Sequence, residues 1–245
     1  MQLDAFAVSI PGRRANNEDA VCMRPELGLF VVADGMGGYE GGEIASAITI
    51  ETIDELVRRT AGAADVTWPY KIDPHLTITE NEVMVATRLA NDRICARRSG
   101  VLDHMGSTVV VLRLVGDRVV IGHVGDSRIY RLRDGVLAQL TVDHSLVAQL
   151  IAAGMPVAEA AEHPYRHVVT RALGAPSAEP EVQLDQAWPR DVFLLCTDGL
   201  SEVLPPHTIA TLLAKPAEAA CRALVDAAYE AGSRDNISAI VVRVS

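Results

Sequence analysis

Aromatic residues are scarce in this sequence. Phenylalanine, tryptophan and tyrosine make up 4% of its 245 residues, although hydrophobic residues as a whole make up 49%. The core must therefore be built mainly from valine, leucine, isoleucine and alanine. Cysteine is rare as well, and the four cysteines show neither C-x-x-C pairs nor a zinc-like spacing with histidine. This pattern argues against a structural zinc site and favours reduced thiols in a cytoplasmic protein.

Basic residues are outnumbered by acidic ones. The chain has 22 lysines and arginines against 32 aspartates and glutamates, a formal net charge of −10. Because nucleic acids and anionic membranes favour clustered basic residues, we expect neither as the main partner. No apolar run approaches the roughly 20 residues that span a bilayer, and residues 1–14 lack the basic-then-apolar order of a signal peptide. We therefore expect a cytoplasmic protein.

Strand-like and helix-like segments occur in blocks. Strand patterns are found at residues 3–10, 19–25, 29–34, 107–115, 118–125, 127–133, 136–140, 181–185, 192–196 and 237–244. Helical spacing is found at about 42–59, 80–98, 207–214 and 216–231. Strands that follow one another in hairpins, with helices between the blocks, favour an α+β fold with antiparallel sheets covered by helices. We predict one domain over residues 1–245.

The segment from 143 to 173 has a helical but interrupted pattern. Gly154, Pro156 and Pro164 break the helical spacing. We predict that this segment, called the flap below, covers part of the molecule.

Several apolar strands run directly into an acidic residue. In LFVVADGMGGYEGGE, residues 29–43, the strand meets Asp34, and five glycines follow within eight residues. Acidic residues stand in comparable places elsewhere in the chain: Asp126, Asp198, Asp235, Glu18 and Asp19. Each one alone is typical of a turn or a cap. Because neighbouring strands lie about 5 Å apart, their ends can bring these residues together in one cluster.

A cluster of carboxylates requires a positive partner, since like charges at short range repel. Carboxylate, carbonyl and water oxygens are the ligands that Mg²⁺ and Mn²⁺ prefer. The glycines after Asp34 allow the carbonyl of Gly35 to face an ion and the chain to pass close to a ligand. The run is not a nucleotide-binding P-loop, because it lacks the Gly-Lys-Ser/Thr ending. The sequence therefore predicts a site for a hard divalent cation.

Six motifs in order resemble one enzyme family. They are Arg14 with NNED, then DGMGG, GSTVV, HVGDSRIYRLRDG, TDGL and RDNISAIVV. Together they look like the metal-dependent, type 2C serine/threonine protein phosphatases in their bacterial form, over almost the whole chain. The resemblance implies two central antiparallel β-sheets sandwiched between pairs of helices. It also implies hydrolysis of phosphoserine and phosphothreonine by a hydroxide that bridges two metal ions, without a phosphoenzyme.

The resemblance assigns roles to individual residues. It implies as metal ligands Asp34, Gly35 through its carbonyl, Asp126, Asp198, Asp235, Glu18 and Asp19. These would hold two Mn²⁺ or Mg²⁺ ions, with Glu18 and Asp19 acting through metal-bound water. A third, weaker ion would lie at Asp126 and Asp198.

Catalysis is expected from Arg14, Asp34 and Asp198. The planar guanidinium of Arg14 would bind the substrate phosphate. Some members of the family carry a histidine, thought to protonate the leaving group, directly after the Asp-Gly of the first motif. This chain has Met36 there, so the general acid is unassigned.

Other conspicuous residues receive plainer interpretations. His123 lies in a strand pattern and is expected in the sheet, whereas His144 is expected to cap or position the flap helix. Arg166 and Arg171 lie in the flap, where either one is a candidate for substrate contact.

Two alternatives to a phosphatase stay open. One is a non-catalytic relative that binds phosphorylated partners, although such a protein would be expected to lose metal ligands. The other is a metal hydrolase acting on nucleotides, although no base-recognition motif is evident. For the phosphatase, the expected partners are phosphorylated proteins and a serine/threonine kinase of opposite action, and we expect a monomer.

Overall fold

The structure is a computed structural model that describes residues 1–37, 41–63, 66–176 and 178–245. The strands form two antiparallel sheets. The first sheet has the order β1 (Leu3–Ile10), β11 (Ile237–Val244), β10 (Val192–Cys196), β7 (Arg128–Arg133) and β8 (Val136–Gln139). The second has the order β2 (Asp19–Arg24), β3 (Leu29–Met36), β5 (Val109–Val115), β6 (Arg118–Val124) and β9 (Glu181–Gln186), with the short β4 (Gly106–Ser107) beside β3.

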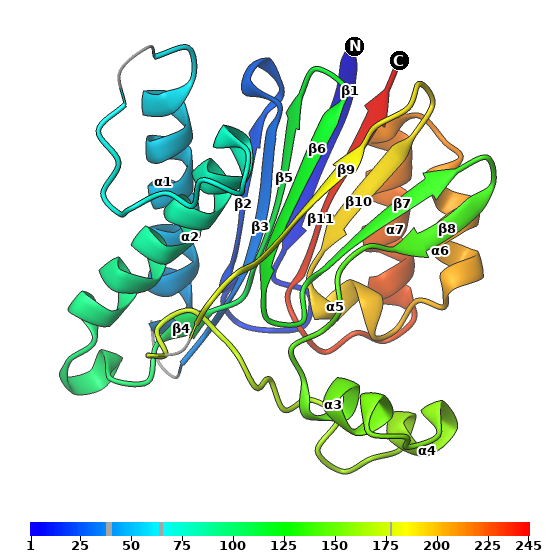
Figure 1. The fold of residues 1–245 in the computed structure, drawn as a ribbon. Coiled ribbons are helices and arrows are strands. Elements are labelled where there is room, and N and C mark those ends of the chain that lie inside the picture. Colours follow the sequence, from blue (N-terminus) through cyan, green and yellow to red (C-terminus); the bar gives the residue numbers. More distant parts are fainter. Residues whose placement is uncertain (38–40, 64–65, 177) are drawn as a thin grey trace.

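Two pairs of helices cover the outer faces of the sheets (Figure 1). α1 (Gly41–Thr60) and α2 (Ile78–Arg97) pack on the second sheet, and α6 (Pro206–Leu213) and α7 (Ala217–Glu230) pack on the first. The remaining helical segments are short: η1 (Pro25–Leu27), η2 (Gly100–Leu102), α3 (Leu146–Ala152), α4 (Val157–Ala161) and α5 (Asp198–Ser201). The predicted α-β-β-α sandwich is thus confirmed.

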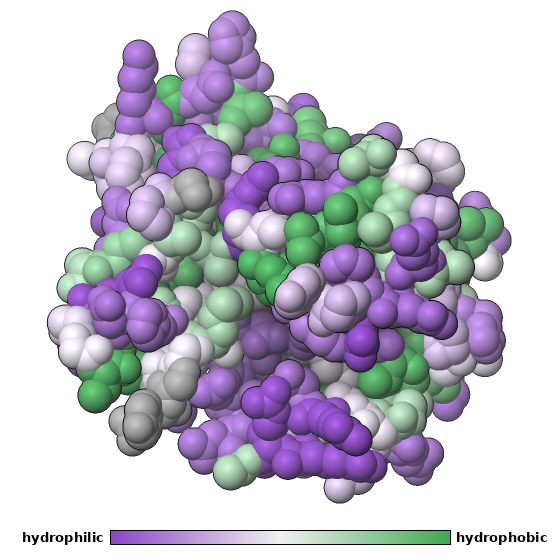
Figure 2. All heavy atoms as spheres, turned by 90° about the horizontal axis from the view of Figure 1, so that it is seen from below, coloured by the Kyte–Doolittle hydropathy of each residue, from purple (hydrophilic) through white to green (hydrophobic). Residues whose placement is uncertain are grey.

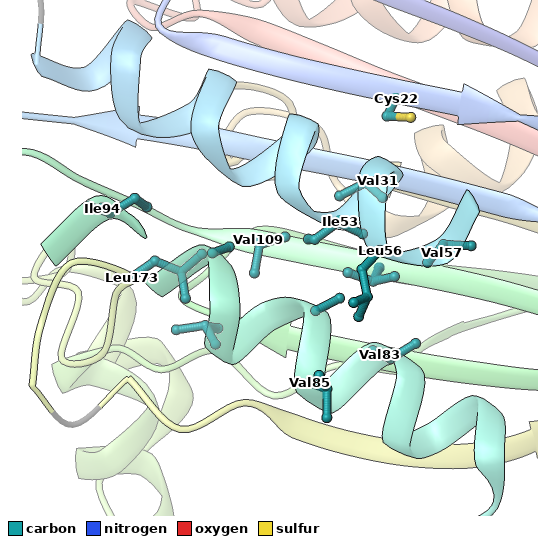
Figure 3. Close-up of a cluster of buried hydrophobic side chains, with 14 of the residues drawn as sticks. Cys22, Val31, Ile53, Leu56, Val57, Val83, Val85, Ile94, Val109 and Leu173 are labelled. Carbon is teal, nitrogen blue, oxygen red and sulfur yellow. The ribbon is translucent and has the colours of Figure 1, made fainter. Parts of the chain in front are cut away.

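Three hydrophobic clusters hold these layers together. The central cluster lies between the inner faces of the sheets and includes the fully buried Phe30 and Phe193. A second lies under α1 and α2, where Ile53 and Val83 point toward the strands (Figure 3). A third lies under α6 and α7, around residues such as Leu224. Burying each such side chain stabilises the fold by about 1.5–3 kcal/mol, so aliphatic residues suffice for this core, as the composition indicates.

Two glycines set the hairpin turns that the sequence predicts. Gly116 joins β5 to β6 with φ +64°, and Gly135 joins β7 to β8 with φ +79°. Asp134 also has a positive φ, +48°. Two consecutive positive φ values are the geometry of the type I′ turn, which Asp-Gly favours.

Three local predictions about strands and acidic motifs need correction. β3 does not stop at Asp34 but continues to Met36, because Gly35 and Met36 pair with β4. Asp198 lies in no simple turn, since it begins the helical turn α5. The stretch at 107–115 is not one strand, because Gly106–Ser107 pairs with β3 as β4 and β5 begins at Val109. The flap is helical but interrupted, as predicted, since Gly154 and Pro156 lie between α3 and α4.

A buried ion pair links α2 to the second sheet. Arg113 Nε donates to Glu82 Oε2 at 2.7 Å, and the two residues are 7% and 4% exposed. We expect Glu82→Ala to lower the free energy of unfolding by about 3–5 kcal/mol, because it leaves the Arg113 charge buried without a partner. Urea denaturation measures this change.

A second variant separates the effect of charge from the effect of volume. Glu82→Leu combined with Arg113→Met removes both charges, so most of the lost stability should return. The exposed pair Arg93–Glu55 is the control, because Glu55→Ala should cost at most about 1 kcal/mol. Equal destabilisation by the single and the double variant would contradict this account.

None of the helices in the described ranges combines the length and the apolar character that crossing a membrane requires.

Candidate active site

The predicted acidic residues meet at the end of the sandwich opposite the chain termini. A cavity of about 480 Å³ opens there, lined by Arg14, Glu18, Asp34, Gly35, Met36, Gly37, Thr108, Asp126, His167, Val169, Asp198 and Asp235. Figure 2 views the molecule from this end and shows a hollow with hydrophilic side chains in it and below it, and hydrophobic side chains along its upper edge. Of the predicted ligands, only Asp19 does not line the cavity, because it lies just beneath it.

Asp19 begins β2 and stands directly opposite Asp34 of β3 in the antiparallel ladder. Its Oδ2 accepts hydrogen bonds from Thr197 Oγ1 at 3.0 Å and from Ser238 Oγ at 2.6 Å. Its Oδ1 is buried and has no hydrogen-bond partner among the described residues. Burial raises the pKa of Asp19 to about 7, and the charge of Asp198 adds to this, although the two hydrogen bonds lower it. One oxygen of Asp19 thus lacks a partner, which a cation or a water molecule would supply.

Asp34 lies on β3 of the second sheet and Asp198 lies just after β10 of the first, and both line the cavity. The backbone of Asp34 is held by Thr108, whose N–H donates to Asp34 O at 2.8 Å and whose hydroxyl accepts from Asp34 N at 3.2 Å. Burial raises the pKa of Asp34 well above its ordinary value, and Asp19 adds to this. Burial and then Asp235 raise the pKa of Asp198 to about 6.

The glycines of the first motif are needed because three chain segments converge there. A Cβ on Gly35 would lie 2.0 Å from the carbonyl oxygen of Gly42 and 2.6 Å from that of Glu18. A Cβ on Gly42 would lie 2.7 Å from the Glu18 carboxyl carbon. Gly37 has φ +125°, a conformation that other residues rarely adopt. The run therefore lets α1 begin against the site, although residues 38–40 lie outside the described part of the chain.

Arg14 and Asp235 form an ion pair at the mouth of the cavity. Arg14 Nη2 donates to Asp235 Oδ2 at 2.8 Å, and Arg14 Nε donates to the carbonyl of Arg234 at 3.0 Å. The side chain of Arg14 is 55% exposed, so part of its guanidinium faces solvent. Arg14 is thus placed to meet an anion that enters the cavity.

Asp126 lies on the loop that passes from β6 of the second sheet to β7 of the first. Burial, with Asp198 and Asp143 adding to it, raises the pKa of Asp126 to about 7. Asp126 also lines an adjoining cavity of about 430 Å³ between the flap and α5. There the flap residue His167 contacts Glu202 through Nδ1 and Oε1 at 2.8 Å.

The two flap arginines lie in different places. Arg166 lines the cavity between the flap and α5, as a residue that contacts substrate would. Arg171 instead donates to Glu181 Oε1 at 3.0 Å and to the carbonyl of Glu179 at 3.2 Å. Its expected substrate contact has no support in this geometry.

The donor set fits hard divalent cations. Two buried carboxylate oxygens, Asp19 Oδ1 and Asp198 Oδ1, have no hydrogen-bond partner among the described residues. Burial and mutual repulsion raise the pKa of several carboxyl groups in the same cluster. A cation among them would satisfy the oxygens and stabilise the ionised forms, and oxygen donors select Mg²⁺ or Mn²⁺.

Sequence reasoning missed the residues that hold the acidic side chains in place. Asn236 accepts the N–H of Glu18 through Oδ1 at 2.9 Å and donates through Nδ2 to the carbonyls of Pro11 and Asn16. Thr108 holds Asp34 in the same manner. Both lie in motifs noted in the sequence, GSTVV and RDNIS, but their partners are far away along the chain. Met36 lines the cavity, and because its thioether has no acidic proton, it cannot protonate the leaving group.

Comparisons with known proteins agree with this architecture. The family model described as protein phosphatase 2C matches residues 12–238. The serine/threonine protein phosphatase PstP of Mycobacterium tuberculosis is 36% identical over 234 residues, which cover 94% of this chain and 43% of that protein. The chain thus spans less than half the length of this relative.

Solved structures match over nearly the full chain. A crystal structure of the Mycobacterium tuberculosis serine/threonine phosphatase PstP/Ppp has a TM-score of 0.88 at 33% identity, with 99% of both chains covered. The catalytic domain of PstP in complex with two manganese ions has a TM-score of 0.84 at 31% identity, again with 99% of both chains covered. On the family match and the identity to these proteins, the chain belongs to the protein phosphatase 2C family.

Proposed function

We propose that this protein is a metal-dependent phosphatase that removes phosphate from phosphoserine and phosphothreonine in proteins. The observation that carries this proposal is the convergence of Asp34, Asp198 and Asp235, from distant parts of the chain, on one cavity. Relatives named serine/threonine phosphatases, one of them solved with two manganese ions, support it. Residues 1–245 would form one catalytic domain that acts as a monomer, since this chain alone supplies the whole cluster.

The proposed metal ligands are the residues that meet in or beneath the cavity. Asp34, the carbonyl of Gly35, Asp198 and Asp235 would hold two Mn²⁺ or Mg²⁺ ions, with Glu18 and Asp19 acting through water. Asp126, together with Asp198, would hold a third ion. When bound, these ions supply an activated water and neutralise the charge of the phosphate. The protein itself contributes the rigid placement of the oxygens.

Arg14 would orient the phosphate. Its guanidinium lies at the mouth of the cavity and forms one ion pair, with Asp235, while its side chain is 55% exposed. Planar guanidinium groups bind phosphate oxygens in pairs, which fixes the phosphorus relative to the carboxylate cluster.

A side-chain hydroxyl nucleophile has no support. Of the cavity-lining residues in the described ranges, only Thr108 carries a hydroxyl group. That hydroxyl is already engaged by Ser127 Oγ at 2.7 Å and by the N–H of Asp34. The cavity therefore favours direct attack by water over a phosphoserine or phosphothreonine intermediate on the enzyme. The filled ligand positions also disfavour a non-catalytic phosphoprotein binder.

Substrate choice is the test of this function. The purified protein with Mn²⁺ should release phosphate from phosphoserine and phosphothreonine peptides, should act far more slowly on ATP, and should stop when a chelator is added. Mn²⁺ binding without turnover on either peptide would favour the non-catalytic binder, whereas preferential hydrolysis of ATP would favour a nucleotide hydrolase. The phosphorylated partner proteins, and a serine/threonine kinase that opposes this enzyme, belong to the same proposal.

A further inference from the structure

His144, the second residue of the flap, is buried just before α3 and does not cap that helix. The cap of α3 is Ser145, whose hydroxyl accepts from Ala148 N at 3.2 Å. His144 is 7% exposed and stacks on His123 of β6, with 4.5 Å between ring centroids. Its hydrogen bonds reach the loop at Gly125 instead.

His144 forms two hydrogen bonds with Gly125. Its backbone N–H donates to Gly125 O at 2.9 Å, and its ring Nδ1 accepts from Gly125 N at 3.0 Å. Gly125 has φ +105°, and a Cβ there would lie 2.6 Å from the side chain of Thr108. Gly125 directly precedes Asp126. The backbone from which the Asp126 carboxylate projects is therefore held from the flap side by one residue.

The same ring connects this loop to both ends of the flap. Because Nδ1 accepts a hydrogen bond, Nε2 carries the proton of the neutral ring and donates to Glu181 Oε1 at 3.0 Å. Arg171, near the far end of the flap, donates to the same oxygen at 3.0 Å, and its Nη1 also lies 3.1 Å from Nε2, which in this tautomer has no lone pair to accept from it. The carbonyl of His144 accepts from Thr170 N at 2.8 Å, which closes the base of the flap.

This arrangement suits a hydrogen-bond network better than a further metal site. His123, His144 and Glu181 each offer a ligand atom within 4.8 Å of the others. However, a metal on His144 Nε2 would require the proton to move to Nδ1, where the N–H of Gly125 already points. The Nε2 of His123 likewise faces an acceptor, the carbonyl of Val142 at 2.9 Å. Burial lowers the pKa of both histidines, which favours the neutral rings that this pattern needs.

We propose that His144 is a positioning residue for Asp126, setting the loop that carries this carboxylate and tying it through Glu181 and Arg171 to the two ends of the flap. The inference rests on the proposed role of Asp126 as a metal ligand. Partners of this kind, which orient a ligand without touching the ion, typically change metal affinity 10–100-fold when removed. A displacement of the flap would thus move His144, and through it the loop that carries Asp126.

Two substitutions at His144 separate its two contacts. The amide oxygen of His144→Asn takes the place of Nδ1 and keeps the bond to Gly125, whereas the amide of His144→Gln takes the place of Nε2 and keeps the bond to Glu181. Mn²⁺ titration by calorimetry should show the Asp126-dependent ion binding about 10–100-fold more weakly in His144→Gln. In His144→Asn its affinity should stay close to that of the wild type. Asp126→Asn identifies this ion, and in that background His144→Gln should have no effect.

The metal-free protein gives a second readout, independent of activity. Nitrogen-15 spectra should show His144 protonated at Nε2, and the Gly125 amide should exchange slowly in the wild type and faster in His144→Gln. His207→Asn, an exposed substitution on α6, is the matched control.

The inference is overturned if His144→Gln binds Mn²⁺ like the wild type, if both variants lose affinity equally, or if His144 is protonated at Nδ1. The last measurement needs no variant to fold. Failure of the proposed function would look different, since a wild type without Mn²⁺-dependent phosphatase turnover would contradict that function whatever the variants bind.

Discussion

Asp198→Asn is expected to lower kcat on a phosphoserine peptide by roughly 10³-fold or more. Asp198 lines the same cavity as Asp34, and its Oδ1 is buried without a partner among the described residues. The neutral amide is a poorer ligand for a hard cation. A bound metal supplies several kcal/mol of transition-state stabilisation, and each 1.4 kcal/mol is about tenfold in rate. Steady-state kinetics at saturating Mn²⁺ measures the loss, and equilibrium dialysis measures the bound ions.

The control for this prediction is Asp226→Asn. It makes the same chemical change at an exposed position on α7, so it should leave both kcat and the number of bound ions unchanged. Full activity in Asp198→Asn would contradict the proposed reaction, because the carboxylate at the centre of the cluster would then be dispensable.

Without metal, the buried aspartates are expected to lower the free energy of unfolding as the pH rises from about 4 to about 7. The pKa of Asp19 is raised from its ordinary value to about 7, chiefly by burial. The folded state therefore holds a proton that the unfolded state loses near pH 4. Stability from this group is complete below that value and is lost as the pH rises through about 7, an effect of a few kcal/mol.

Mn²⁺ should reverse this trend. Metal binding requires the ionised carboxylates, so affinity should increase with pH over the same range and protons should be released on binding. Thermal unfolding at several pH values, with chelator and with saturating Mn²⁺, tests both statements. His123 and His144 act in the opposite sense, because burial lowers their pKa. The decisive comparison is therefore with Asp19→Asn, whose metal-free stability should depend less on pH. An equally steep dependence in that variant would count against Asp19 as the source.

Much of the fold follows from local patterns that need no distant partner. The apolar runs at 3–10 and 237–244 form β1 and β11 with the predicted bounds, because both faces of each strand pack into hydrophobic clusters. Asp134-Gly135 determines its own hairpin. The helix at 80–98 begins two residues earlier than predicted, because Thr77 caps it with Glu80 in a reciprocal pair of hydrogen bonds.

The site was predictable only as far as its residues share a local signal. An apolar strand that meets aspartate and glycine marks Asp34 and Asp198, and the family resemblance supplies their ligand roles as a proposal. No local sequence pattern indicates the hydrogen bonds that hold these residues in place. Asn236 holds Glu18 across 218 residues, and His144 holds Gly125 across 19. Such bonds depend on how the sheets meet, which no window of the sequence contains. The extension of β3 past Asp34 was missed for the same reason, since it requires β4.

The position of β11 has a consequence for biosynthesis. This strand follows all the others along the described chain, yet it lies between β1 and β10 and begins two residues after Asp235. A nascent polypeptide that has not yet released β11 from the ribosome leaves its first strand without its neighbour and lacks Asp235, one of the proposed ligands. If the proposed function holds, metal loading must await the emergence of that strand, and an incompletely translated chain would have no phosphatase activity.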